Sequence, residues 1–136
     1  MTKDLNEVYS IDPHDGLIAA VYPPADVFHV TLRKATGTAI TLARGTLLDL
    51  STGTAGDSKL VIHGTVAVEN ETLTANCVLA DDYEVGTTAD VIAAAYRTGH
   101  FVEDKLVIAE SASITAADKE ALRSVGILLS DAFAVS

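Results

Sequence analysis

The sequence FHVTL at residues 28–32 alternates apolar and polar side chains with a period of two. That period is typical of a β-strand with one face buried and the other face toward solvent. AITLA at residues 39–43 repeats the alternation after the turn-forming triplet TGT at residues 36–38. The pattern therefore predicts strands joined by turns.

The chain beyond residue 43 keeps this pattern of strands and turns. Residues 51–58, STGTAGDS, consist almost wholly of turn formers and predict a loop between two strands. The densest carboxylate cluster, residues 81–84, lacks the Asp spacing of a calcium-binding loop and predicts a solvated turn. The strands expected here are residues 46–50, 59–63, 76–80 and 90–96, and a hairpin from His100 through Val102 to residues 106–108.

One helix is predicted near the C-terminus. Thr115 is a good N-cap, and Asp118 follows at the spacing of a capping box. Gly126 supplies the left-handed residue that commonly ends a helix. Between the two ends, one helical face carries the apolar residues Ala117, Ala121, Leu122 and Val125. Residues 127–129, ILL, then predict a closing strand.

Residues 1–27 are predicted to form an extended arm ahead of a β-rich domain at residues 28–136. The arm holds all three prolines of the chain and a turn signal, DPHDG, at residues 12–16. The apolar patch LIAAVY, residues 17–22, is too short for a helix and is followed by Pro23. We therefore expect the patch to lie outside the domain core, as an extended segment that pairs with something else.

The composition argues against several classes of protein. Nineteen Asp and Glu residues against nine Lys and Arg give a formal net charge of −10. Nucleic acids and anionic membrane surfaces both attract cationic proteins, so neither is an expected partner. No stretch approaches the ~20 apolar residues of a membrane span, and residues 1–10 lack the apolar core of a signal peptide. Aromatic residues are only 5% of the chain, which leaves few large side chains to wall a deep pocket.

No residues in the sequence have the spacing of a catalytic or metal-binding motif. The four histidines form no HxH or HExxH pair, and His29 and His63 fall within strand patterns that favour a structural role. Cys77, in the apolar run CVLA, is expected to be a buried small side chain. Neither a GxSxG elbow nor a glycine-rich phosphate loop occurs. We therefore expect no catalytic residue, no cofactor and no bound metal.

Residues 75–82 read ANCVLADD, and residues 90–101 read DVIAAAYRTGHF. The first segment resembles the G/A-x-x-V/I-L-x-x-D segment of bacteriophage head decoration proteins, the family of the lambda capsid-stabilising protein. The second resembles that family's next element, a strand that runs into a small-Gly-x-Phe turn. Three further segments are similar and stand in the family's order: GTLL at 45–48, LVI at 106–108, and the predicted helix followed by GILL at 126–129. The resemblance covers roughly residues 40–130.

The resemblance implies a mainly β fold, a compact small β-barrel or β-tulip-like domain with one short helix near the C-terminus. It implies a virion structural protein, not an enzyme, that binds the outside of the expanded capsid and stabilises it. The implied partners are the major capsid protein and two further copies of the chain, in a homotrimer at local threefold positions. The protein would be made in the bacterial host cytoplasm. The residues expected in the capsid-binding arm are Leu17, Ile18, Val21, Tyr22, Val27 and Phe28.

Two other functions fit the sequence. A tail-tube or head-completion protein is also small, β-rich and part of a virion, and would form rings or tubes. A small-molecule or carbohydrate-binding β module would need exposed aromatic side chains in a concave site. The nearby candidates for that role are Tyr83, Tyr96 and Phe101.

Overall fold

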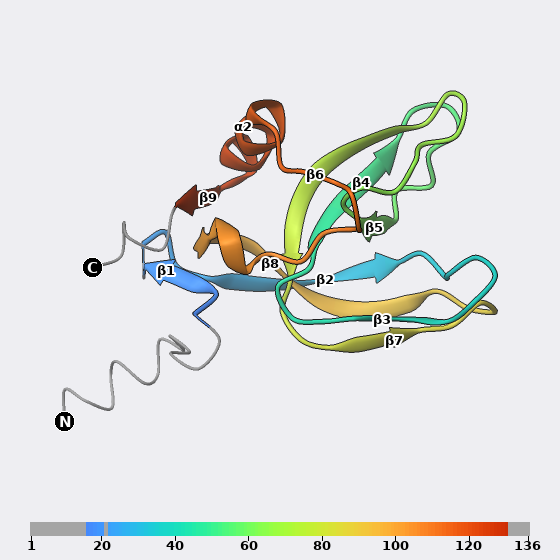
Figure 1. The fold of residues 1–136 in the computed structure, drawn as a ribbon, viewed down its shortest axis with the longest axis horizontal. Coiled ribbons are helices and arrows are strands. Elements are labelled where there is room, and N and C mark those ends of the chain that lie inside the picture. The colour runs from blue at the N-terminus through green and yellow to red at the C-terminus, as the bar shows by residue number, and fades with distance from the viewer. Residues whose placement is uncertain (1–15, 21, 131–136) are drawn as a thin grey trace.

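The computed structural model of the protein describes residues 16–20 and 22–130, which form a mainly β domain with one α-helix (Figure 1). The strands are β1 (Ile18–Ala20), β2 (Asp26–Leu32), β3 (Ile40–Leu42), β4 (Leu47–Thr52), β5 (Leu60–Ile62), β6 (Thr72–Leu79), β7 (Tyr83–Val85), β8 (Val91–Val102) and β9 (Ile127–Ser130). The helix is α2 (Ala116–Val125), and a short 3-10 helix, η1, covers Glu103–Lys105. The predicted fold class is confirmed.

Five strands close into a small barrel in the order β8–β2–β5–β4–β6 and back to β8. β2 is antiparallel to β8 along its whole length, and β4 is antiparallel to both β5 and β6. Two short contacts complete the ring. Leu32 lies opposite Leu60 where β2 and β5 run parallel, and Val78 and Leu79 join β6 to β8. A closed barrel leaves these five strands without an open sheet edge.

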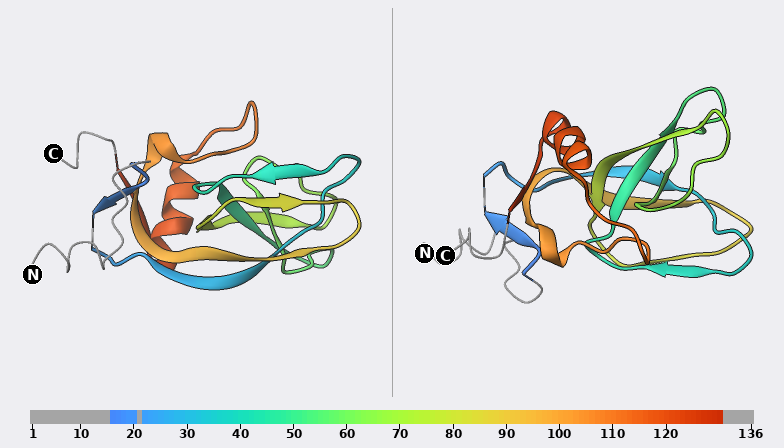
Figure 2. Two further views of the ribbon diagram at one scale, coloured as in Figure 1. Left: turned by 90° about the horizontal axis from the view of Figure 1, so that it is seen from below. Right: turned by 45° about the horizontal axis from the view of Figure 1, so that its top comes forward.

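β8 is longer than predicted and belongs to two parts of the structure. Its first half lies in the barrel, and its second half continues to Val102 between β1 and β9 (Figures 1 and 2). The predicted hairpin from His100 to residues 106–108 is wrong, because His100 is inside this strand. Only an isolated bridge between Thr46 and Val107 remains of the second predicted strand. Gly99 does not end the strand, because its φ of +151° is still extended enough to pair with β9.

β3 and β7 form a separate two-stranded sheet. β7 was missed, since the carboxylates of residues 81–84 indicated a solvated turn, and that prediction is wrong from Tyr83 onward. Val85 is fully buried, and the Tyr83 hydroxyl accepts a hydrogen bond of 2.9 Å from the backbone N–H of Ala94 on β8. Burial of Val85 and this anchor outweigh the polarity of the residues before them.

The apolar patch of the predicted arm is part of the core along residues 17–20. Leu17 is 2% exposed, Ile18 and Ala19 are also buried, and β1 is antiparallel to β8. The backbone N–H of Val102 donates to the Leu17 carbonyl at 2.8 Å. The expectation that this patch lies outside the core is therefore corrected: it pairs with its own chain. The rest of the predicted arm before Gly16 lies outside the described residues.

Helix α2 begins and ends as predicted. The Thr115 hydroxyl accepts from the Asp118 N–H, and the Asp118 carboxylate accepts from the Thr115 N–H, so both halves of the capping box are present. Gly126 ends the helix with a φ of +105°. The apolar stripe is narrower than predicted, since Leu122 is its only fully buried member and Val125 is 43% exposed.

Candidate interaction surface

Three strands form a small sheet at one end of the barrel, which we call the end sheet: β1, residues 99–102 of β8, and β9. β1 is antiparallel to β8, and β9 is parallel to β8. Parallel strands need a crossover connection, and here the chain passes from β8 to β9 through η1 and α2 (Figure 2). Nε2 of His100 lies 3.0 Å from Oγ of Ser130 and adds a side-chain contact across β8 and β9. Among the described residues, β1 and β9 each have β8 as their one partner strand. A strand with one free side can accept a further strand through its backbone.

The structure describes five of the six residues predicted to bind a capsid, and their exposure to solvent differs. Leu17 and Ile18 are buried in the core of the protein itself, so their assignment to a partner-binding surface is corrected. Tyr22 is 81% exposed and Val27 is 46% exposed, so both side chains are available to a partner. Phe28 is partly buried, and Val21 lies outside the described residues.

Polar contacts hold residues 22–28 against β8. The Thr98 hydroxyl donates to the Pro24 carbonyl at 2.8 Å, and Arg97 Nε donates to Asp26 at 3.2 Å. The Arg97 guanidinium also lies 6.0 Å from the centre of the Phe28 ring. The exposed side chains of Tyr22 and Val27 are therefore carried by a segment with defined attachments to the barrel.

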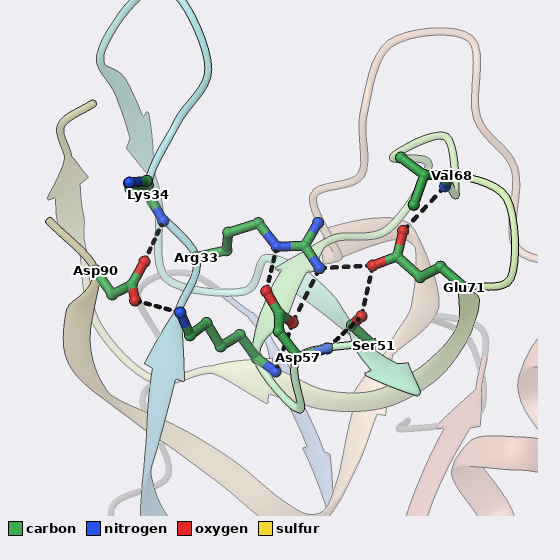
Figure 3. A network of polar contacts seen from close by, with 8 residues as sticks. Arg33, Lys34, Ser51, Asp57, Val68, Glu71 and Asp90 are labelled. Atoms are coloured by element: carbon green, nitrogen blue, oxygen red, sulfur yellow. Dashed lines mark hydrogen bonds and ion pairs between the residues drawn. The ribbon is translucent and has the colours of Figure 1, made fainter. Parts of the chain in front are cut away.

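A network of charges joins four parts of the chain at the ends of β2 and β4 (Figure 3). Arg33 lies between two carboxylates, with 2.9 Å from Nε to Asp57 and 2.6 Å from Nη2 to Glu71. The Ser51 hydroxyl donates to the same Glu71 carboxylate. Hydrogen bonding to Arg33 lowers the pKa of Asp57 to about 2, and hydrogen bonds from Ser51, Val68 N–H and Arg33 lower the pKa of Glu71 to about 2. These carboxylates stay ionised at neutral pH and act as anchors for Arg33, not as proton donors.

A second ion pair extends this network to the start of β8. Lys59 Nζ lies 2.6 Å from one carboxylate oxygen of Asp90, and the other oxygen accepts from the Lys34 N–H at 2.9 Å (Figure 3). The sequence places these residues far apart, and none was predicted as part of a site. The network ties the loops after β2 and β4 to the residues before β6 and β8.

His63 is the centre of a second, buried cluster of polar groups. Its Nδ1 lies 2.8 Å from Asp49 Oδ1, and its Nε2 lies 2.8 Å from the Ser113 carbonyl and 3.3 Å from Asp118 Oδ2. The prediction that His63 is a structural histidine with satisfied ring nitrogens is confirmed. His29, the other histidine predicted to be structural, is exposed on β2.

Cys77 is fully buried on β6, as predicted. Burial raises the pKa of its thiol to about 12, and the nearby Asp49 carboxylate acts in the same direction. A thiol with such a pKa is uncharged at neutral pH and is a poor nucleophile.

The aromatic residues proposed for a carbohydrate site belong to the interior. Phe101 is fully buried, and its ring centre lies 5.3 Å from that of Tyr96. Tyr96 is buried as well, with its hydroxyl hydrogen-bonded to Arg44. Tyr83 is partly buried and hydrogen-bonded to β8. A hollow of about 220 Å³ does open beside β3 and β5, with Arg33 and Lys34 as its charged members and no aromatic residue in its lining.

The fold and these contacts define a small closed β-barrel with an end sheet, a charge network and a buried histidine cluster. Within residues 16–20 and 22–130, no three His, Cys, Asp or Glu side chains are grouped so that they could hold a metal ion. None of the described helices is long and apolar enough to cross a membrane. Comparison with protein-family models and with curated proteins finds no match for the chain.

Proposed function

We propose that the protein is a bacteriophage capsid decoration protein, which binds the outside of the expanded shell and stabilises it. The fold supports this proposal because the segments that resemble head decoration proteins coincide with its strands. Residues 75–82 cover the second half of β6, residues 90–101 cover β8, and residues 126–129 lead into β9. β6 and β8 are joined in the barrel wall, so the resemblance extends over neighbouring strands.

The end sheet is the observation that carries the proposed mode of binding. A capsid strand that adds to β1 or β9 would gain backbone hydrogen bonds, and side chains beside the sheet would give specificity. Tyr22 is exposed on the segment that leads from β1 to β2, and Val27 is exposed near the start of β2.

The proposed assembly is a homotrimer at local threefold positions of the shell, with the major capsid protein as partner. Addition of one short strand costs conformational entropy in both chains and forms few contacts, so the affinity of a single copy for the shell is expected to be weak. Three copies linked in one trimer raise the effective concentration of each end sheet, and such linkage can gain ~10²–10⁴ in avidity. A trimer that binds only the expanded shell stabilises that shell by linkage.

Binding to shells tests this proposal directly. Expanded capsids that lack the protein, from a phage that encodes it, are mixed with purified protein and sedimented, and electron microscopy locates the added density. We expect density on the outer surface at threefold positions, and a loss of binding for Val27→Asp. Ile92→Asp is the matched control, since Ile92 is 66% exposed on β8 in the barrel, away from the end sheet. Virions with this protein in their tails, or capsids that bind none of it, would contradict the proposal.

A further inference from the structure

His63 lies where three parts of the chain meet, and we infer that it is a proton-operated clasp. The clasp holds residues 109–118, the segment before α2 together with the first turn of α2, on the barrel wall. The proposal concerns the protein alone and stands independently of the proposed binding to a capsid.

The contacts of His63 show which elements it joins. The residue follows β5, and its Nδ1 lies 2.8 Å from Asp49 of β4. Its Nε2 lies 2.8 Å from the carbonyl of Ser113 and 3.3 Å from the carboxylate of Asp118 on α2. The backbone also takes part, since the His63 carbonyl accepts from the Ala109 N–H at 2.9 Å. One buried side chain thus bridges the barrel to the segment that leads into the helix.

The segment rests closely on the chain beside His63. A Cβ atom added to Gly64 would lie 2.6 Å from Cβ of Ala112 and 2.8 Å from Cβ of Ala109. Distances this short leave no room for a side chain at residue 64, so the methyl groups of Ala109 and Ala112 pack directly on the Gly64 backbone. The clasp therefore acts on a tightly packed contact and not on a loose loop.

The partners of the ring require a proton that an ordinary neutral histidine does not carry. The Ser113 carbonyl can only accept, so Nε2 must carry a hydrogen. An ionised Asp49 can also only accept, so Nδ1 must carry a hydrogen too, unless the carboxyl itself is protonated and donates to the ring. In either arrangement one proton is shared between His63 and Asp49. Without that proton, the lone pair of one ring nitrogen would face a lone pair of Asp49 Oδ1 or of the Ser113 carbonyl oxygen, and that hydrogen bond would be lost.

The surroundings favour retention of this proton. Asp49 on β4 and Asp118 on α2 are the titratable groups that face the ring, and Cys77 on β6 lies near Asp49. Burial lowers the pKa of His63, but hydrogen bonds to Asp49 and Ser113 and the two negative charges outweigh it, so the pKa is raised. Burial also raises the pKa of Asp49, although His63 opposes this. The pKa values of His63 and Asp49 are thus both raised, as expected for two groups that together hold a proton more tightly than either would alone.

The sign of the pH effect follows from the raised pKa of His63. The stabilisation is fully present below the pKa of an unfolded histidine, about 6.5, and is lost as the pH rises through the folded value. Loss of the shared proton breaks one of the two ring contacts, and residues 109–118 are then held only by packing and backbone bonds. A base-induced opening of this segment, with the barrel intact, is the expected behaviour.

Amide hydrogen exchange and histidine NMR measured on the whole protein test the clasp. The proton shared by His63 and Asp49 is expected to be lost above about pH 6.5, the ordinary value for histidine. After correction for intrinsic exchange rates, the amides of Ala109 and Lys119 should open at least about tenfold more between pH 6 and pH 9, the change in population that one lost hydrogen bond produces. The Leu79 amide, bonded to Thr46 at 2.9 Å within the barrel, is the internal reference and should not follow them.

Two variants separate the clasp from general loosening. In Asp49→Asn, the amide of the new side chain can donate to the ring while Nε2–H donates to Ser113, so the contact needs no extra proton. Opening of Ala109 should then lose its pH dependence, whereas the control His29→Gln should behave as the parent protein. The proposal is overturned if neither His63 nor Asp49 holds the shared proton at pH 6, if Ala109 and Lys119 open no more than Leu79, or if Asp49→Asn keeps the parent's pH dependence.

Discussion

Gly99 offers the sharpest test of how β8 passes from the barrel into the end sheet. A Cβ atom at this position would lie 2.6 Å from Cζ and 2.8 Å from Cε2 of Phe101. Phe101 is fully buried and packs against Tyr96, so its ring has no space in which to move away. Overpacking of this kind typically costs about 1–3 kcal/mol. The φ of +151° adds about 1 kcal/mol or more for a residue with a Cβ.

The expected cost of Gly99→Ala is therefore about 2–4 kcal/mol, a large part of the ~5–15 kcal/mol that stabilises a typical domain. Urea unfolding followed by circular dichroism gives the free energy of unfolding. Gly86→Ala is the matched control, since no atom lies within 4 Å of its added Cβ, and we expect a change within about 0.5 kcal/mol.

A double-mutant cycle then shows whether the Phe101 ring is the cause. Phe101→Leu removes the two ring atoms that the new methyl group meets, so adding Gly99→Ala to it should cost less than in the parent protein. The coupling between such neighbours is expected to be about 0.5–3 kcal/mol. A cost for Gly99→Ala no greater than for Gly86→Ala, or strict additivity with Phe101→Leu, would refute the reasoning.

Four further measurements address other parts of the structure. Removal of residues 1–25 deletes β1 and the buried side chains of Leu17 and Ile18, so the free energy of unfolding should fall by about 3–6 kcal/mol. The arm hypothesis predicts that removal of residues 1–15 alone changes the melting temperature little. Cys77 should react with thiol reagents only after denaturation, and Cys77→Ala should cost about 1–2 kcal/mol. The lowered pKa values of Asp57 and Glu71 stabilise the protein above their ordinary values of 3.8 and 4.5, so the melting temperature should fall as the pH drops from 4.5 toward 2, and less so in Asp57→Asn. Sedimentation should show trimers that strengthen with added salt, because each chain carries −10, and monomers at every salt concentration would argue against the trimer.

Local signals in the sequence were sufficient for much of the fold. The capping box at Thr115 and the glycine at residue 126 predict both ends of α2, because helix termini are governed by a few neighbouring residues. Alternation predicts β2, since one face of that strand is buried along most of its length. The apolar run around Cys77 likewise predicts a buried strand.

The elements that were missed depend on distant partners. β1 is three residues long and has no strand pattern of its own, and it becomes a strand by pairing with residues 100–101 of β8. Gly99 looked like a turn residue, but it is there because the Phe101 ring occupies the space of a side chain. The extra length of β8 follows from partners on both sides of that glycine.

The polar clusters could not be predicted from neighbouring residues, because their members are also far apart in the sequence. Asp49 and His63 are 14 residues apart and meet because β4 and β5 are antiparallel neighbours. One signal was present in the sequence: Asp49 interrupts the apolar run LLDL, where a charged side chain needs a buried partner. The other carboxylate beside His63 is Asp118 on α2, 55 residues beyond His63, and no spacing rule connects the two.

β8 pairs with β1, β2, β6 and β9, and this sets the order of events when the chain is made. A ribosome must translate residues 91–98 of β8 before the barrel can close, so the residues of β2 wait for antiparallel partners that lie 59 to 72 residues downstream. Strand pairs this far apart in sequence form slowly, because the entropy of closing a large loop is lost before any stabilising contact is made. Until then the early strands expose unpaired edges, which are prone to aggregation. A nascent chain that stalls before β8 is thus a target for chaperones and proteases.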